Sequence, residues 1–332
     1  MNARLARRAS GPATALWLAL VGACPAFCPA SPPGAAGSDR GVDAAVWSSS
    51  WLDVRWPERV KYGITPVLDR ERLERGHQPL CDELGRILGT RVELVVADSY
   101  ANLGERVARR EIAVGQFSPL AWVEAKAAFP ELRLVASMIA EGGADYAGYI
   151  VARAESDIMR ADDLRGHSFG FVDRSSASGY LFPLVYLWDR YGDPQSFFSS
   201  IHFLGNHDEL LRAVASGEVD AGATFSAALV NSGRAGLGSP FRIVAKTGRV
   251  PYDAMAAGPA LNDSQARALQ AALLSIDTRS PRGRRVLGPL RLANGFVPGD
   301  DRRYQPVRER LARAALFGAS IVGAEAEPDA GR

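Results

Sequence analysis

Three serines that follow a short apolar stretch have the clearest chemical potential in this sequence. Residues 169–172 predict a buried strand, and the apolar spacing within residues 181–187 predicts a helix after it. Ser175, Ser176 and Ser178 would then lie at a helix N-terminus, where unpaired backbone N–H groups and the positive end of the helix dipole attract anions. Their hydroxyl groups add further donors, so this segment could hold a compact oxyanion without a lysine.

The same serines also fit a purely structural role. Serine is a common N-cap, because its side-chain oxygen accepts a hydrogen bond from a backbone N–H of the first helical turn. The stretch alone leaves the anion-binding and the capping interpretations open. The rest of the predicted fold, which positions the serines, must therefore decide between these two interpretations.

The first part of the chain predicts an α/β unit. Strands alternate with helices here, which implies a mostly parallel sheet whose ligand crevice lies beyond the carboxyl ends of the strands. Thr65, Tyr100 and Ser118 follow three of these strands, so we expect them to share one rim. The predicted strands are 60–66, 91–97 and 112–117, and the predicted helices run to about residue 88, over 101–110 and onward from Pro119.

A second α/β unit follows, and the chain then returns to the first. The body, at roughly 270 residues, exceeds what one core usually organises, so two domains are expected. Residues 146–152 and 250–253 predict the two crossings of a hinge. The predicted lobes are 56–150 plus 252–320 and 151–251; the second contains strands near 168–172, 201–204, 220–224 and 241–246 and helices over 176–191 and 207–215.

The N-terminus predicts an export signal. Three arginines precede an uncharged run, 13–23, which is too short to span a bilayer but is typical of a secretory signal, and we assign residues 1–24 to it. The run ends in a sequence similar to a lipoprotein processing site, in which Cys24 would be lipidated. Cleavage after Ala30 or Ala36 is the alternative. The remaining boundaries are a flexible tether over 25–55 and a disordered tail over 321–332.

Composition excludes several classes of function. Removing the three leader arginines from 39 basic residues leaves 36 against 37 acidic residues, so the body lacks the basic excess of a nucleic-acid-binding protein. Cys81 is the one cysteine beyond the tether and predicts a buried apolar position. The sequence contains no glycine-rich nucleotide loop, zinc-spaced Cys/His set or His-Glu-x-x-His motif, so we expect no cofactor and no metal.

Four separated motifs lie in residues 161–183, 204–208, 213–224 and 250–253. Together they resemble the phosphate-, phosphite- and phosphonate-binding proteins of ABC transporters. The resemblance covers about residues 62–304 and implies a two-lobed periplasmic binding protein that closes on its ligand. It also implies a monomer located in the periplasm, lipid-anchored if Cys24 is modified, with an ABC permease as its partner.

The resemblance also assigns roles to individual residues. It places Ser176, Ser178 and the adjoining backbone amides on a phosphorus oxyanion, with His207 donating to another oxygen. The other residues that it implies are Ala177 and Gly179 beside the serines, Tyr100 and Tyr146 reaching in from the first lobe and the crossing strand, and Asp253 on the return crossing. Structural alternatives stay open: a capping or surface histidine, tyrosines packed in the core, and an aspartate that stabilises a turn.

Two departures from the family pattern bear on the ligand. Ala177 replaces the usual threonine, so one hydroxyl donor is missing unless Ser175 takes its place. Phe225 and the three residues after it stand where relatives that bind an aminoalkylphosphonate carry an acid. The sequence therefore favours phosphate, phosphite or a small alkylphosphonate over a zwitterionic ligand.

Two other functions fit parts of the sequence. A ligand-binding protein of this kind could serve a sensor system instead of a permease. A hydrolase could use one of the serines as nucleophile with His207 as base, but no Gly-x-Ser-x-Gly elbow is present and no acid is placed to orient the histidine. We therefore expect a binding protein without enzymatic activity.

Overall fold

The computed structural model describes residues 54–232, 241–290 and 292–317, which belong to one compact unit. The predicted leader with Cys24, nearly all of the tether and the C-terminal tail lie outside the described residues. No helix within the described ranges combines the length and the apolarity that a membrane span requires.

The first lobe is built on a six-stranded sheet. Its strands are β1 (Arg59–Ile64), β2 (Arg91–Val96), β3 (Val114–Phe117), β4 (Arg133–Ala140), β10 (Ala254–Ala257) and β11 (Ala293–Pro298), and its helices are α1 (Arg70–Leu88), α2 (Tyr100–Ala108), α3 (Pro119–Ala128), α8 (Asp263–Leu274) and α9 (Pro281–Leu287). The strand order is β11-β4-β10-β3-β1-β2. Strand β10, which follows the entire second lobe in sequence, thus lies in the middle of this sheet.

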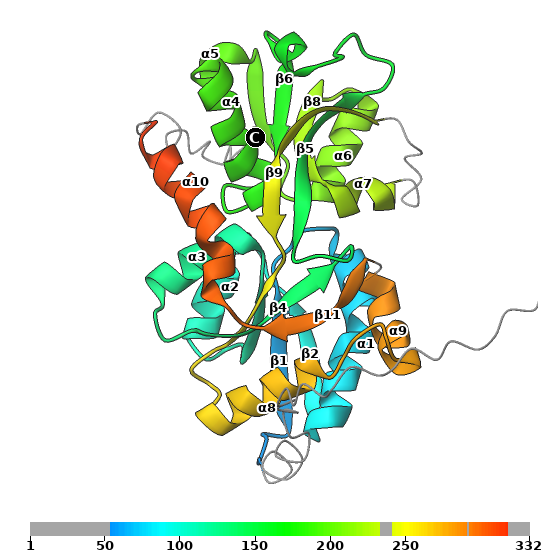
Figure 1. Ribbon diagram of the computed structural model, residues 1–332, viewed down its shortest axis with the longest axis vertical. Helices are drawn as coiled ribbons and strands as arrows, with labels where there is room; N and C mark the ends of the chain where they lie inside the picture. Colours follow the sequence, from blue (N-terminus) through cyan, green and yellow to red (C-terminus); the bar gives the residue numbers. More distant parts are fainter. Residues whose placement is uncertain (1–53, 233–240, 291, 318–332) are drawn as a thin grey trace, which may run out of the picture. The chain divides into compact units, whose positions relative to one another are not determined.

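The second lobe is built on a five-stranded sheet in the upper half of Figure 1. Its strands are β5 (Asp145–Arg153), β6 (Ser168–Phe171), β7 (Ser200–Phe203), β8 (Ala221–Phe225) and β9 (Phe241–Pro251), and its helical elements include η2 (Ala177–Leu181), α4 (Phe182–Tyr191), α5 (Pro194–Phe197), α6 (His207–Ser216) and α7 (Ser226–Ser232). The strand order is β7-β6-β8-β5-β9.

Both sheets are mixed, which corrects the expectation of mostly parallel sheets. In the first sheet β1 pairs in parallel with β2 and β3, whereas β10 is antiparallel to β3 and β4, and β11 to β4. In the second sheet β6 is parallel to β7 and β8, while β5 is antiparallel to β8 and β9. The strands that run against the βαβ units are β10 and β5, which enter a lobe at the crossings, and β11, whereas β4 and β9, which leave a lobe, run with those units.

The two crossings between the sheets lie side by side. The first is residues 141–144, which follow β4, and the second is Tyr252 and Asp253, between β9 and β10. The backbone N–H of Tyr252 donates to the carbonyl of Ala144 at 3.2 Å. Strand β5 pairs with the second sheet from its first residue, so the lobe boundary lies in 141–144 and not at residue 151.

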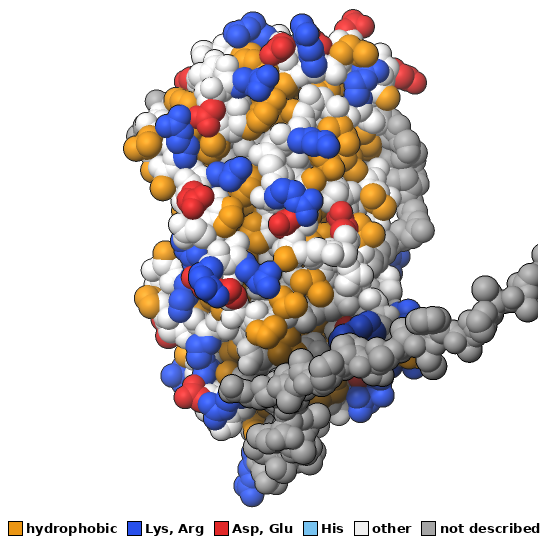
Figure 2. Space-filling model, viewed as in Figure 1, with side chains coloured by type: hydrophobic (Ala, Val, Ile, Leu, Met, Phe, Trp, Pro, Cys, Tyr) orange, Lys and Arg blue, Asp and Glu red, His pale blue; other side chains and the backbone are white. Residues whose placement is uncertain are grey.

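Helix α10 (Gln305–Ala315), orange-red in Figure 1, packs against α3 of the first lobe and α4 of the second. Arg313 donates to the Asp189 carboxylate at 2.7 Å, and the Phe317 ring stacks on Trp188 with centroids 4.5 Å apart. Just before α10, Trp122 of α3 donates to Asp301 at 3.0 Å. The C-terminal helix therefore belongs to neither lobe alone. Figure 2 shows side chains of both charges, with hydrophobic ones between them, on this face.

Candidate functional site

A cavity of about 680 Å³ lies between the two sheets. Both lobes line it: the first contributes residues from β1, α1, β3 and β4, and the second contributes residues from β5, η2, α6 and β8. The predicted site residues that line the cavity are Ser118, Tyr146, Ser176, Ala177, Ser178, His207 and Asp253. Those that do not line it are Thr65, Tyr100, Ser175 and Gly179.

The serine segment forms a helix start, as the sequence predicted, but with one π-helical turn before α4. Ser176 is the N-cap: its Oγ accepts from the backbone N–H of Gly179 at 3.0 Å. Gly179 is needed for packing, because a Cβ there would lie 2.5 Å from the Val172 Cβ. Ser176 therefore caps the helix and also lines the cavity, whereas Ser178 lines the cavity without capping.

Ser178 is the serine whose hydroxyl is placed for a ligand. It is buried and lines the cavity, and the Tyr146 hydroxyl donates to its Oγ at 3.4 Å. Burial raises the pKa of Tyr146 above its ordinary value of 10.0, so the tyrosine stays protonated and remains the donor. The Ser178 hydrogen is consequently available to an acceptor in the cavity, beside the first N–H groups of the helix.

Ser175, offered above as a substitute donor, points elsewhere. It does not line the cavity, and its side chain lies beside the carboxyl group of Glu124. Burial raises the pKa of that carboxyl group, and the hydrogen bond with Ser175 offsets part of this effect. Ala177 lines the cavity without a hydroxyl. A ligand at this turn would thus meet the Ser178 hydroxyl, the capping Ser176 side chain and backbone N–H groups.

His207 lies at the start of α6, at the junction of the lobes. Its backbone N–H donates to the carbonyl of Val67 in the first lobe at 3.1 Å, and its Nδ1 lies 3.1 Å from the Thr224 Oγ1. The Phe225 ring packs edge-on against the imidazole, with centroids 4.7 Å apart. Burial lowers the pKa of His207 to about 3, so the ring is neutral in the ligand-free protein.

Asp253 contributes a second buried ionisable group to the cavity. Its carboxylate accepts from Gln116 Nε2 at 2.7 Å, and Gln116 Oε1 accepts in turn from the Tyr62 hydroxyl at 2.7 Å. Burial raises the pKa of Asp253 from 3.8 to about 6, and the Gln116 hydrogen bond offsets part of that effect. Near neutral pH this carboxyl can therefore exchange a proton and can donate to an oxygen when protonated.

Thr65 and Tyr100 support the cavity wall from behind. The Thr65 hydroxyl donates to the carbonyl of Gln116 at 3.2 Å and accepts from the Ser118 N–H at 3.1 Å, which ties the ends of β1 and β3 together. Tyr100 is fully buried, and its hydroxyl lies beside the Ser176 side chain. The rim predicted from the strand ends therefore exists at Thr65 and Ser118.

Sequence reasoning missed several residues of the site. Gln116 is a polar residue in the otherwise apolar, fully buried strand β3, and that pattern could have identified it. Tyr252 adjoins Asp253 and lines the cavity, with its hydroxyl beside the Glu141 carboxyl group. The Ser118 Oγ is buried without a hydrogen-bond partner in the described ranges, and because such groups are rare in folded proteins it favours a polar ligand.

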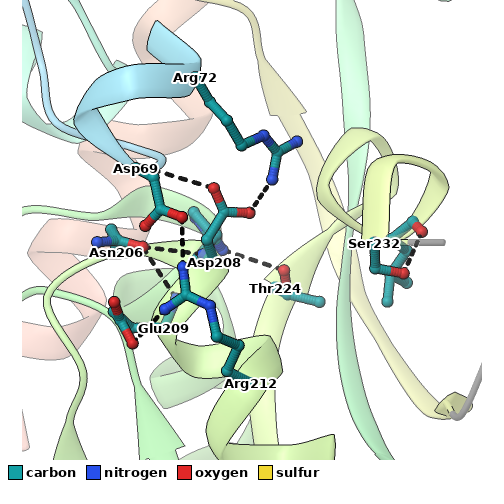
Figure 3. Close-up of polar contacts among 10 residues, drawn as sticks. Asp69, Arg72, Asn206, Asp208, Glu209, Arg212, Thr224 and Ser232 are labelled. Atoms are coloured by element: carbon teal, nitrogen blue, oxygen red, sulfur yellow. Dashed lines mark hydrogen bonds and ion pairs between the residues drawn. The ribbon is translucent and has the colours of Figure 1, made fainter. Parts of the chain in front are cut away.

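Four charged residues, which we call the interlobe latch, connect α1 and its N-cap to α6 (Figure 3). The backbone N–H of Asp69 donates to the Asp208 carboxylate at 3.0 Å, Arg72 pairs with the same carboxylate, and Arg212 pairs with that of Asp69. Asp208 is almost completely buried; the motif over residues 204–208 ends with it, but no role was predicted for it. The latch therefore links the two lobes beside the cavity.

The described residues contain no group of three or more His, Cys, Asp or Glu side chains arranged to hold a metal ion. His207 faces Thr224 and not a serine, so the described site lacks the hydrogen-bonded Ser–His pair that activates a nucleophile. The cavity offers neutral hydrogen-bond donors (serine hydroxyls, helix N–H groups, a neutral histidine and tyrosines) and, from α1, the guanidinium groups of Arg72 and Arg75. Such a set suits binding of an oxyanion.

Comparisons with known proteins agree with this geometry. Residues 62–304 match the family model for the ABC transporter phosphonate periplasmic substrate-binding protein. The phosphate-import protein PhnD of Mycolicibacterium smegmatis is 32% identical over 179 residues. The match covers 51% of this chain and 56% of the relative, so this chain spans only about half the length of that protein.

Solved structures share the fold. A binding component of a phosphonate ABC transporter from Pseudomonas aeruginosa has a TM-score of 0.71 at 20% identity, covering 79% of this chain and 89% of that one. PhnD1 from Prochlorococcus marinus, solved with methylphosphonate, has a TM-score of 0.70 at 20% identity, covering 78% and 99%. The family model spans most of the chain. This chain therefore belongs to the family of periplasmic substrate-binding proteins of phosphonate ABC transporters.

Proposed function

We propose that this protein captures a phosphorus oxyanion (phosphate, phosphite or a small alkylphosphonate) in the interlobe cavity and presents it to an ABC permease. The observation that carries the proposal is the Ser178 hydroxyl, which faces the cavity at a helix N-terminus with its hydrogen free. His207, Asp253 and Tyr252 surround the same space and supply the remaining contacts. The similarity to the M. smegmatis phosphate-import protein supports this class of ligand.

The proposal includes the chain's location and its mode of action. The protein acts as a monomer in the periplasm after its leader is removed, and Cys24 carries a lipid that keeps it near the permease. It binds without turnover. Release of a Cys24→Ala variant from the membrane fraction would support the anchor, and a mature N-terminus beyond Cys28 would contradict it.

Calorimetric titration tests the ligand. Phosphate, phosphite, methylphosphonate, sulfate and 2-aminoethylphosphonate are titrated into the purified protein, and one of the first three should bind with a micromolar or tighter dissociation constant, about −8 kcal/mol or better. Binding of 2-aminoethylphosphonate or sulfate in preference to all three would contradict the assignment.

Ser178→Ala tests the site itself, with Ser175→Ala as the matched control. Loss of a hydrogen bond to a charged ligand should weaken binding by about ten- to a hundredfold, corresponding to ~1.5–3 kcal/mol. Ser175 lies outside the cavity, so its variant should bind as the wild type does. Equal affinities for the two variants would place the anion elsewhere.

A further inference from the structure

The cavity is larger than a bare phosphorus oxyanion requires. Phosphate has five non-hydrogen atoms, and at the roughly 30 Å³ that each water occupies in the liquid they fill only about 150 Å³. The cavity measures about 680 Å³, within the range of pockets that hold much larger organic ligands. Most of the space therefore lies beyond the oxyanion site formed by Ser178, His207 and Asp253.

This additional space, which we call the outer subsite, is framed by α1 and by residues 288–290. Leu73 and His77 line it from α1, and Leu290 lines it from the other side. The helix and Leu290 approach closely, since a Cβ on Gly76 would lie 3.3 Å from Leu290 Cδ2. The subsite reaches the surface at exposed Pro289, so an occupant can extend from the oxyanion site towards solvent.

His77 gives the outer subsite a specific polar group. The side chain is buried, with 5% of its surface exposed, and its Nδ1 lies 2.9 Å from the Leu73 carbonyl. A carbonyl can only accept, so Nδ1 carries the hydrogen and Nε2 presents its lone pair. Burial lowers the pKa of His77 to about 4, which keeps the ring neutral, and Nε2 has no hydrogen-bond partner in the described part of the chain. The outer subsite thus contains one unpaired acceptor among leucines.

The charges around the subsite restrict its occupant. Among the described residues that line the cavity, the single carboxylate is Asp253, which belongs to the oxyanion site and is held by Gln116. Arg72 and Arg75 line the cavity from α1. Arg72 pairs with Asp208 and Arg75 with Glu71, so an ammonium group would find no free carboxylate there, whereas a neutral hydroxyl or amide N–H can donate to His77 Nε2.

We propose that the outer subsite binds the organic substituent of a phosphonate or phosphate monoester whose apolar stem ends in an uncharged hydrogen-bond donor, which His77 Nε2 accepts. This inference rests on the proposed function, because the oxyanion site holds the phosphorus group and sets where the substituent begins. It assigns to this chain a substituted phosphorus oxyanion in preference to an inorganic one.

A series of hydroxyalkylphosphonates of increasing chain length, each with a terminal hydroxyl, tests the proposal by calorimetry. Each is compared with the alkylphosphonate in which a methyl group replaces that hydroxyl, and matched alkyl phosphate monoesters distinguish esters from phosphonates. At the length that reaches His77, the hydroxyl compound should bind about tenfold tighter than its methyl counterpart. His77→Leu should abolish this preference and leave methylphosphonate affinity unchanged.

Two further variants complete the test. His77→Gln retains an acceptor and should recover part of the preference, and His202→Leu, at an exposed position of β7 outside the cavity, should behave as the wild type. The outer subsite is refuted, and the proposed function is not, if methylphosphonate binds but none of the ligands with a longer chain binds more tightly than it does. The same holds if His77→Leu weakens the binding of methylphosphonate as much as that of the hydroxyalkylphosphonates. If no phosphorus oxyanion binds at all, the proposed function fails and this inference fails with it.

Discussion

Replacing Asp253 by asparagine should stabilise the ligand-free protein at neutral pH. The carboxyl group is buried, with one hydrogen bond from Gln116, and its pKa is raised from 3.8 to about 6. Because one pKa unit corresponds to about 1.4 kcal/mol, the folded state penalises the ionised carboxylate by about 3 kcal/mol. Asparagine has a similar shape, keeps an oxygen for Gln116 and never ionises.

The sign of the pH dependence follows from the raised pKa. The folded protein holds the Asp253 proton more tightly than the unfolded chain, so the associated stability is complete below about pH 4 and is lost as the pH rises through about 6. The free energies of unfolding of the wild type and Asp253→Asn should therefore agree near pH 4. At about pH 7.5 the variant should be more stable, by up to about 3 kcal/mol.

Chemical denaturation of both proteins across this pH range measures the difference. Asp98→Asn is the control, because the Asp98 side chain is 77% exposed and its replacement should leave the pH profile nearly unchanged. A variant that differs from the wild type by less than about 0.5 kcal/mol at pH 7.5, or by an amount that does not change with pH, would refute the argument from burial.

Three further changes test other parts of the structure. Asp208→Asn removes the charge on which the interlobe latch depends, so ligand affinity should fall by about ten- to a hundredfold. The control is Glu209→Gln, whose partner Arg212 lies on the same helix, and this variant should bind within about twofold of the wild type. Similar affinities of the two variants in a titration would contradict the latch. Gly179→Ala should lower the unfolding free energy by about 1–3 kcal/mol, since the added Cβ meets Val172; an unchanged denaturation midpoint would show that the turn can relax. Burial lowers the pKa of His207 to about 3, so acidification below about pH 6.5 should destabilise the wild type more than His207→Gln, and parallel pH profiles would exclude a neutral buried histidine.

Much of the fold could be predicted from the sequence because local patterns carry it. Strands and helices such as β1, α2 and α6 were located within a few residues by their apolar periodicity. Apolar periodicity does not show in which direction a strand runs relative to its neighbours. The apolar segment that became β5 has the pattern of a strand in either lobe, and only its pairing with β8 and β9 places it entirely in the second sheet.

The candidate site was predicted in composition but not in detail. The sequence located the serines at a helix start, yet which hydroxyl caps the helix and which lines the cavity without capping depends on the π-helical turn. There the Leu181 N–H donates to the Ser176 carbonyl at 3.0 Å, which shifts the side chains out of α-helical phase. His77 and Asp208 were missed because each looks like an ordinary helical residue until the other lobe or the cavity wall is in place.

The position of β10 has a consequence for how this chain reaches its native state. Ala256 pairs with Gly115 in the middle of the first sheet, although the whole second lobe separates them in sequence. The second sheet is contiguous and can fold as soon as its own segment is complete, whereas the first must wait for a distant strand, which makes its closure slow. Until then β3 and β4 present unpaired edges that can associate with other chains. A newly synthesised chain should therefore complete its second lobe first, and molecules truncated before residue 254 should aggregate.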